Sequence, residues 1–336
     1  MKILIIQTAF IGDVILATAM IEQLKRFYPD AQLDFLLRKG NEGLLNGHPH
    51  LHQILIWDKK QGKYRQLWRL LGQIRDERYD WVVNCQRFAA SGFLTAFSGA
   101  KNTVGFNKNP FSFLFAQSVP HRIGASTSRF GLPWQHEVDR NLSLITSITD
   151  MSPQKPVLYP SEADFLLAKE MAGDRPYVCI APTSVWFTKQ WPPEKWLELI
   201  AVLPPEITVF LLGAPSDRAQ CQAIADASAR SGIENLAGKL SLTASAALLK
   251  GAVMNYVNDS APLHLASAVN APVTAVFCST IPEFGFTPLS DHHEIWQISA
   301  PLSCRPCGLH GYNKCPKGHF KCAYDIAPAW LSTPAE

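Results

Sequence analysis

The chain has 336 residues, of which 47% are hydrophobic and 18% charged, and its 31 Lys and Arg against 28 Asp and Glu give a net charge of +3. This composition excludes a disordered chain, because it supplies enough apolar material for a large core. The near balance of charge argues against a dedicated nucleic-acid binder, which needs many uncompensated cations. At about 150 residues per domain, the length predicts two domains and a cleft between them.

The longest apolar runs, such as Val14 to Ile21, are shorter than the roughly 18 to 20 residues that a membrane span needs. The opening sequence MKILIIQTAFIGD has one Lys and a short apolar run, but Asp13 interrupts the run and no clear cleavage site follows. We therefore expect a first β-strand rather than a signal peptide. Without an export signal, we expect a cytoplasmic protein whose eight cysteines stay reduced.

The first half of the chain alternates between strand-like and helix-like segments. Lys2 to Gln7 is a β-branched apolar run, the loop Thr8 to Gly12 follows, and Val14 to Phe27 has helical periodicity. Further strands are predicted at 32–37, 53–57, 81–86 and 103–106, with a helix at 64–78. This alternation is typical of a mostly parallel sheet with helices on its faces.

A domain boundary is expected between Ile148 and Pro176, where the sequence contains four prolines and no strand pattern. The alternation then restarts with strands predicted at 177–181, 207–213, 254–258 and 273–278 and helices at 193–202, 217–231, 243–250 and 261–269. The pattern predicts an α/β chain with two doubly wound, Rossmann-like domains that face a central cleft. Ligands of such domains bind at the carboxyl ends of the strands.

Several common nucleotide-binding motifs are absent. The sequence has neither G-x-G-x-x-G nor G-x-x-x-x-G-K-[ST], which argues against a dinucleotide dehydrogenase and against a P-loop NTPase. It also lacks Asp-x-Asp, the divalent-metal clamp of many nucleotide-sugar enzymes. The negative charge of a bound phosphate must then be met by protein groups.

Asp13 is the first candidate functional residue, at the predicted junction between strand and helix. Gly12 permits a tight turn, and a carboxylate at a helix start is stabilised by the exposed N–H groups there, so Asp13 is explained equally by a capping role. A carboxylate on such a loop can also accept a proton from an attacking hydroxyl.

The second candidate segment is a loop that leads from a strand into a helix. Thr183, Ser184 and Thr188 offer hydroxyls, and Lys189 is a compact cation suited to a phosphate near a helix N-terminus. The alternative for Lys189 is an ordinary solvated surface lysine.

The third candidate is Asn258-Asp259-Ser260-Ala261-Pro262-Leu263-His264, again a strand end that runs into a helix. Ser260 or Asp259 is expected to cap that helix, and the N–H groups of its first turn form an anion site. His264 falls one turn inside; a structural role is its alternative. A fourth loop holds Gly213 and Asp217, where an acidic residue suits a ribose hydroxyl but is also a good helix cap.

Together these segments resemble glycosyltransferase family 9, the bacterial ADP-heptose–lipopolysaccharide heptosyltransferases. The resemblance covers nearly the whole chain and rests on GDVILATAM, TSVWFTKQWP, LLGAPSD, AGKLSLTASAALLKGA and NDSAPLHLASA, which occur in the family's order. It implies the two-domain GT-B fold and an inverting, metal-independent transfer of heptose from ADP-heptose to the inner core of lipid A. No cofactor is then required for catalysis.

Carried over by position, the resemblance implies that Asp13 is the general base and Lys189 the cation on the leaving diphosphate, with Thr183, Ser184 and Thr188 beside it. It implies donor contacts from Asp259, Ser260, Ala261 and His264, a ribose contact from Asp217 and adenine packing near Gly213. Ala261 replaces a glycine that is usual in the family, and its methyl group would crowd the phosphate or require a slightly different backbone.

The resemblance also implies a division of labour between domains. Residues 1–160 would bind the acceptor, completed by the tail 323–336, and residues 161–322 would bind the donor. Arg87, Lys101 and Arg122 are expected to meet acceptor carboxylates and phosphates, as are Lys108, His121 and Arg129; solvated surface cations are the alternative for each. The partners are then ADP-heptose, a lipid A core and, peripherally, the cytoplasmic face of the inner membrane, with no nucleic acid.

Four of the eight cysteines lie in the segment 304–322, as Cys304, Cys307, Cys315 and Cys322. Four thiols at this spacing can build a structural zinc or iron site, and one branch of the resembling family carries an iron-binding finger here. The alternative is a loop packed by reduced thiols.

Three other functions stay open at the level of sequence. A heptosyltransferase acting on a protein acceptor would share every motif above. A sugar-nucleotide epimerase or hydrolase on the same fold would need a second acid/base pair, and none is evident. A noncatalytic, metal-bound assembly protein would tolerate the loss of Asp13.

Overall fold

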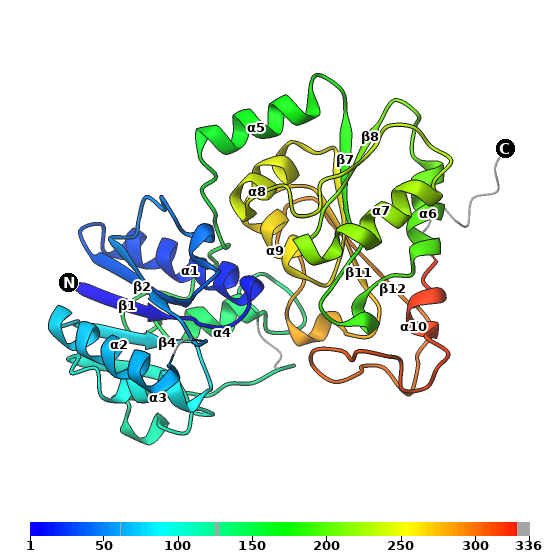
Figure 1. Ribbon diagram of the computed structural model, residues 1–336. Helices are drawn as coiled ribbons and strands as arrows, with labels where there is room; N and C mark the ends of the chain where they lie inside the picture. The colour runs from blue at the N-terminus through cyan, green and yellow to red at the C-terminus, as the bar shows by residue number, and fades with distance from the viewer. Residues whose placement is uncertain (61, 125–127, 328–336) are drawn as a thin grey trace. The chain divides into compact units, whose positions relative to one another are not determined.

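The computed structural model describes residues 1–60, 62–124 and 128–327, and the chain divides into two compact units, Met1–Tyr159 and Pro160–Glu336 (Figure 1). The boundary falls one residue before the predicted one. Each unit contains its own six-stranded sheet.

Every strand pair in unit 1 is parallel, and the strand order is β3-β2-β1-β4-β5-β6. The strands are β1 (Lys2–Ile6), β2 (Gln32–Arg38), β3 (Gln53–Trp57), β4 (Trp81–Asn84), β5 (Asn102–Phe106) and β6 (Gln117–Val119). The order reverses between β1 and β4. That position is the topological switch point, where parallel sheets of this kind open a crevice.

The helices of unit 1 are α1 (Ile11–Phe27), α2 (Lys63–Glu77), α3 (Ala89–Ala96) and α4 (Glu137–Ser143), with 3₁₀ turns η1 (Glu42–Leu44) and η2 (Ser112–Leu114). One face of the sheet packs on α2 and α3 through a core that includes Leu4, Ile6, Leu70, Ile74 and Leu94 (Figure 1). The helix α1 begins three residues earlier than its apolar periodicity predicts, so that Asp13 lies within it.

Unit 2 repeats the arrangement in the order β12-β11-β10-β7-β8-β9, again with parallel pairs only. Its strands are β7 (Tyr177–Ala181), β8 (Thr208–Leu211), β9 (Ile233–Asn235), β10 (Met254–Asn258), β11 (Val273–Phe277) and β12 (His293–Gln297). The switch point lies between β7 and β10. The chain therefore contains two doubly wound α/β units, as expected.

The helices of unit 2 are α5 (Glu162–Ala172), α6 (Pro193–Val202), α7 (Arg218–Ala227), α8 (Leu242–Gly251), α9 (Ala261–Ala268) and α10 (Lys321–Tyr324), with 3₁₀ turns η3 (Phe187–Lys189), η4 (Pro215–Asp217) and η5 (Pro282–Phe284). The prolines at positions 192 and 193 start α6, since proline fits the first helical turn. A core around Trp191 and Trp196 joins one face of the sheet to α6, α7 and α10.

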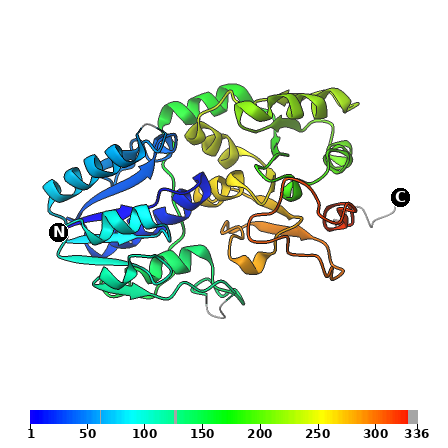
Figure 2. The ribbon, with the colours of Figure 1, turned by 60° about the horizontal axis from the view of Figure 1, so that its bottom comes forward.

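The expectation that the tail 323–336 completes the first unit is wrong for the part that the structure describes. Ala323 and Ile326 are buried in the core of unit 2, and the indole N–H of Trp191 donates to the carbonyl oxygen of Ala323 at 3.1 Å. Figure 2 shows this red segment within unit 2. Residues 328–336 lie outside the described residues.

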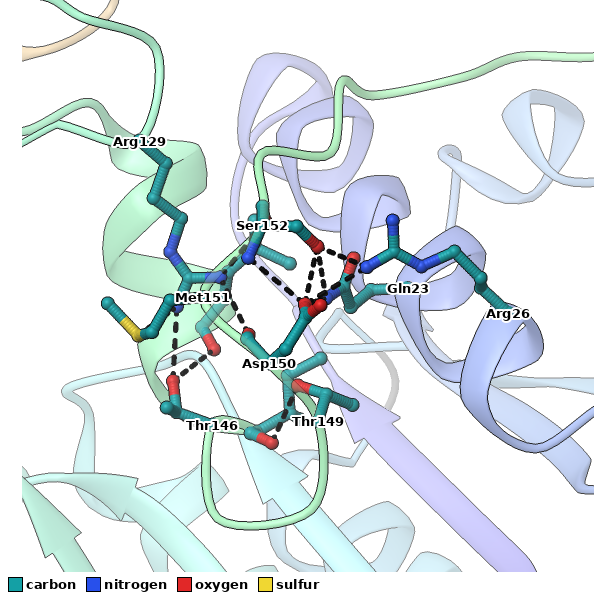
Figure 3. A network of polar contacts seen from close by, with 10 residues as sticks. Gln23, Arg26, Arg129, Thr146, Thr149, Asp150, Met151 and Ser152 are labelled. Atoms are coloured by element: carbon teal, nitrogen blue, oxygen red, sulfur yellow. Dashed lines mark hydrogen bonds and ion pairs between the residues drawn. The ribbon is translucent and has the colours of Figure 1, made fainter.

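A polar network holds the last segment of unit 1 on α1 (Figure 3). The Asp150 carboxylate accepts hydrogen bonds from Gln23 at 2.7 Å and from Arg26 at 3.0 Å. Arg129 donates to the backbone oxygens of Asp150 and Ser152 and to the Thr146 hydroxyl. Arg129 is therefore a structural residue rather than the acceptor contact that we expected.

None of the helices in the described ranges combines the length and the apolar character that crossing a membrane requires.

Candidate active site

In unit 2, Lys189 and Asp259 form a close ion pair at the carboxyl edge of the sheet. The Lys189 ammonium lies 2.7 Å from Asp259 Oδ2, and both side chains are largely shielded from water. The Thr280 hydroxyl donates to the same carboxylate oxygen at 2.6 Å. Lys189 is therefore not the solvated surface lysine of the alternative interpretation.

The backbone around this pair is fixed by hydrogen bonds between strand ends. The Asn258 side-chain oxygen accepts the Trp191 N–H at 2.9 Å, and the Asp259 N–H donates to the Val276 oxygen at 3.1 Å. These bonds join the loop that carries Lys189 to the ends of β10 and β11. The pair is consequently held at the switch point of unit 2, where a ligand is expected.

The N-terminus of α9 opens beside Asp259. Its N-cap residue is Ser260, and no side chain caps the helix. Ser260 thus takes the N-cap position that we expected, but its side chain makes no capping hydrogen bond: the Ser260 hydroxyl donates to the Asn258 oxygen at 3.4 Å, and Asp259 binds Lys189 and Thr280. An uncapped helix start and a neighbouring ammonium together suit an anion. Ala261 takes an ordinary helical backbone at the first position of α9.

His264 is buried one turn into α9. Burial lowers its pKa to about 4; the Asp259 charge opposes this shift and the Lys189 charge adds to it. The ring is therefore neutral at pH 7. Its Nδ1 has no hydrogen-bond partner among the described residues. A buried, unsatisfied ring nitrogen next to a charged pair favours a role in ligand contact over a structural one.

Thr188 joins this site to a loop that the sequence analysis did not connect with it. The Thr188 hydroxyl oxygen accepts hydrogen bonds from the Ser279 hydroxyl at 3.0 Å and from the Tyr312 N–H at 2.8 Å. Gly311 has a φ of +81°, and a Cβ there would lie 2.9 Å from the Thr188 hydroxyl oxygen. A glycine is thus required for the close approach of this loop.

Thr183 and Asp217 form a second polar group, after β7 and β8. The Asp217 carboxylate accepts the Thr183 hydroxyl at 3.0 Å and the Ala214 N–H at 2.9 Å. Gly213 lies against Asp217, since a Cβ added to Gly213 would be 2.9 Å from the Cβ of Asp217. Asp217 therefore organises its own loop, which fits the capping alternative. Ser184 is half-buried, and its carbonyl oxygen accepts from Gln190 at 2.7 Å.

In unit 1, Asp13 is the third residue of α1, and its carboxylate accepts the Phe10 N–H at 3.2 Å. Burial, followed by the negative charge of Glu137, raises the pKa of Asp13 to about 6; the Phe10 bond and the Arg38 charge oppose the rise. Asp13 is thus both a helix-start residue and a carboxylate whose pKa suits a general base near neutral pH.

Glu137 is a functional candidate that the sequence analysis missed. It lies in the first turn of α4, is 7% exposed, and forms an ion pair of 2.6 Å with the buried guanidinium of Arg140. The sequence offered only two opposite charges three positions apart, a spacing that is also common on exposed helix faces.

A cavity of about 300 Å³ lies at the switch point of unit 1. Its lining includes Thr8 after β1, Gln86 after β4, and Trp57, Lys59 and Phe88. The Lys59 ammonium donates to the Thr8 carbonyl oxygen at 2.8 Å.

Three of the cations expected to contact the acceptor lie in different places. Arg87 follows β4 and is half-buried, and Arg122 is exposed beyond β6. Lys101 precedes β5 and forms an ion pair of 2.7 Å with Asp80, which precedes β4. Lys101 is therefore at the amino edge of the sheet, opposite to Asp13, and the geometry does not support it as an acceptor contact.

The four-cysteine segment does not fit the predicted metal site. The described residues contain no group of three or more His, Cys, Asp or Glu side chains placed to hold a metal ion. Cys322 lies in the core of unit 2, and Cys315 packs against the same core. Cys304 Sγ lies 3.8 Å from the His319 ring, and Cys307 and Cys315 are half-buried.

Both units thus carry polar residues at the switch point of a doubly wound sheet, the arrangement of a two-domain α/β enzyme. The family model for glycosyltransferase family 9 (heptosyltransferase) matches residues 67–311, and the chain belongs to this family. It is accordingly a glycosyltransferase.

Named relatives agree with this assignment. The chain is similar to lipopolysaccharide heptosyltransferase 1 of Pseudomonas aeruginosa, with 26% identity over 91% of this chain and 86% of that protein. Lipopolysaccharide heptosyltransferase 3 of Escherichia coli is 28% identical over 81% of this chain and 82% of that protein. The solved structure of E. coli ADP-heptose lps heptosyltransferase II has the same fold, with a TM-score of 0.75, 22% identity, and coverage of 96% of this chain and 97% of that one.

Proposed function

We propose that this chain transfers heptose from ADP-heptose to the inner core of lipopolysaccharide, with inversion at the anomeric carbon. The names of its relatives support the sugar and the acceptor class. The observation that carries the proposal is the Lys189–Asp259 pair beside the uncapped start of α9, because this arrangement suits a diphosphate.

In this proposal, the donor diphosphate binds at the start of α9 and the Lys189 ammonium neutralises its charge. Asp259 holds Lys189 in place, and Thr280 in turn orients Asp259. His264 is neutral and contacts the ligand through Nδ1. Thr183, Asp217 and Gly213 shape the loops that would border the nucleoside.

Asp13 acts as the general base. The acceptor hydroxyl gives its proton to the Asp13 carboxylate while its oxygen forms a bond to the anomeric carbon. The bond from that carbon to the diphosphate oxygen breaks, and ADP leaves with the electron pair. Lys189 and the N–H groups of α9 stabilise the departing charge. A single displacement of this kind inverts the configuration.

The acceptor is expected at unit 1, where the cavity at the switch point is lined by Lys59, Trp57 and Phe88. Arg87 and Arg122 follow strands at the same edge and are proposed to meet its anionic groups. A peripheral contact with the cytoplasmic face of the inner membrane belongs to this proposal, because a lipid A-linked acceptor is anchored in a membrane.

The four cysteines have no step in this reaction, and no His, Cys, Asp or Glu group within the described ranges is placed to hold a metal ion. Elemental analysis of freshly purified, reduced protein tests whether zinc or iron is bound in stoichiometric amount.

The direct test incubates the purified protein with ADP-heptose and heptose-free lipopolysaccharide, without added metal, and detects the product by mass spectrometry. We expect the acceptor mass to rise by one heptosyl residue and the Asp13→Asn variant to form almost none. Binding of ADP without any transfer to this acceptor would contradict the proposal.

A further inference from the structure

Charge is distributed unevenly along this nearly neutral chain. Residues 59–136 contain twelve Lys and Arg but only three Asp and Glu, a net charge of +9 in a chain whose total is +3. The remainder therefore carries −6. No acidic residue occurs from 81 to 136. A region of this kind attracts an anionic partner.

The same region exposes large apolar side chains on α2 and on η2. Tyr64 and Trp68 lie one turn apart on α2 and are 74% and 63% exposed, and Phe113 and Leu114 in η2 are 79% and 46% exposed. Such large apolar side chains on one surface are unusual unless they bind something.

Ring contacts join the aromatic side chains of α2, of α3 and its C-terminal end, and of the residue before η2. Trp68 packs on Phe93 of α3 with ring centroids 5.2 Å apart, and Phe93 contacts Phe97 at 5.1 Å and Phe111 at 6.3 Å. Phe111 precedes Phe113 by two residues. We call this surface the aromatic patch; it consists of Tyr64, Trp68, Phe93, Phe97, Phe111, Phe113 and Leu114.

Cationic residues follow the aromatic residues in the sequence of α2. Arg65 follows Tyr64 and Arg69 follows Trp68, and both arginines are exposed on α2. The helix buries Leu70, Leu71 and Ile74 against the sheet, so that its apolar side is already used and its outer side carries the aromatic and basic residues. Aromatic rings with adjacent Lys and Arg are the composition of helices that lie in a membrane interface.

We propose that the aromatic patch with Arg65 and Arg69 docks on an anionic lipid surface. The rings enter the headgroup region and the guanidinium groups pair with lipid phosphates. The inference rests on the proposed function only in that the acceptor is lipid-linked. The patch begins at α2 and α3, which start at the carboxyl edge of the sheet, the edge that also holds the cavity lined by Trp57 and Phe88.

A second copy of the chain fits this surface less well than lipid. A symmetric pairing through the patch would bring the same positive charges of both copies together, which opposes association. An anionic bilayer supplies opposite charge and an apolar interior at once.

The experiment measures flotation of the full chain with vesicles of phosphatidylcholine alone and of phosphatidylcholine and phosphatidylglycerol in equal parts. We expect binding to the anionic vesicles that weakens as salt rises, because surface charge is screened. Two double variants, Y64S/W68S and R65Q/R69Q, should each lower the vesicle affinity by about tenfold or more. Only the arginine variant should also reduce the salt dependence.

The matched control is L166S/R175Q in unit 2, which removes an exposed apolar residue and an exposed arginine elsewhere and should bind vesicles as the wild type does. The inference is overturned if the wild type ignores anionic vesicles or if both double variants bind them unchanged. A concentration-dependent dimer that Y64S/W68S abolishes would assign the patch to a second copy instead.

Heptose transfer to a deacylated, water-soluble inner core separates this inference from the proposed function. The patch variants should keep the wild-type rate on that acceptor and lose rate only on acceptor embedded in vesicles. If the wild type fails on the soluble acceptor, the proposed function fails while the vesicle result stands.

Discussion

The Asp13 carboxylate lies at the start of α1 and is the general base of the proposed function. Because burial and Glu137 raise its pKa to about 6, a base role requires activity to fall as the pH drops below about 6, by roughly tenfold per pH unit. We expect Asp13→Asn to lower kcat by about 100-fold or more while ADP affinity is unchanged. The measurement is a pH profile of kcat/KM. Glu137→Gln should move its acidic limb to lower pH, and an unmoved limb would show that another group titrates.

The same pKa shift predicts a change in stability with a defined sign. The folded state holds the Asp13 proton more tightly than the unfolded chain does, so this stabilisation is full below pH 3.8 and is lost as the pH rises through about 6. Asp13→Asn should therefore raise the Tm at pH 7.5. The free energy of unfolding should increase by an amount on the order of 1 kcal/mol. Asp150→Asn is a control with the opposite expected sign. Hydrogen bonds lower the pKa of Asp150, so removing this carboxylate should lower the Tm at pH 7.5 (Figure 3).

Lys189 is expected to act in both donor binding and leaving-group departure. Lys189→Ala removes the ammonium 2.7 Å from Asp259 and leaves a poorly exposed carboxylate that repels a diphosphate. ADP-heptose affinity should fall by about tenfold or more, and turnover should also slow. Lys195→Ala on α6 is the matched control, because Lys195 is a lysine six positions away that forms an ion pair of 2.8 Å with Glu198 of the same helix. Equal donor affinities in the two variants would remove Lys189 from the site.

At the scale of elements, Gly311 allows a C-terminal loop to meet the loop of Lys189. A methyl group at this position would lie 2.9 Å from the Thr188 oxygen and 3.1 Å from the Lys189 side chain. Gly311→Ala should therefore raise the KM for the donor. Gly318 has a similar φ of +74°, but a Cβ there would meet no neighbouring atom, so Gly318→Ala is the control. Both variants should lose about 1 kcal/mol of stability, and only Gly311→Ala should change the KM for the donor. Donor kinetics with Tm values would separate the two effects, and equal KM changes would refute this link.

Elements with a strong local signal were predictable from sequence. The strand at 53–57 and the helix at 193–202 were predicted with the bounds that the structure gives, since apolar runs and an N-terminal proline mark them. The helix α5 was missed because four prolines dominate its surroundings, although Ser161 and Asp164 form a capping pair at its start. The Glu137–Arg140 pair could not be predicted, because burial of charged residues depends on how α4 packs on α1 rather than on its own sequence.

For the whole molecule, the alternating pattern was enough to predict two doubly wound units, because each strand and helix repeats the same local periodicity. The same pattern could not predict which unit the C-terminal segment packs on. Cys322, Ala323 and Ile326 have no periodic signature, and their place in the core of unit 2 follows from Trp191 offering them a buried surface and a hydrogen bond. Residues far apart in sequence decide such contacts.

The division into two units, each with its own sheet and core, predicts that the chain unfolds in two calorimetric transitions. ADP binds unit 2 in the proposed function, so ADP at about 100 times its Kd should stabilise one transition by about 2.7 kcal/mol and leave the other in place. The pH-dependent shift of Asp13→Asn should appear in the other transition, because Asp13 belongs to unit 1. Lys189→Ala should reduce the stabilisation by the same ADP concentration to about 1.4 kcal/mol or less. A single transition, or ADP and Asp13→Asn shifting the same one, would show that the two units do not unfold as separate bodies.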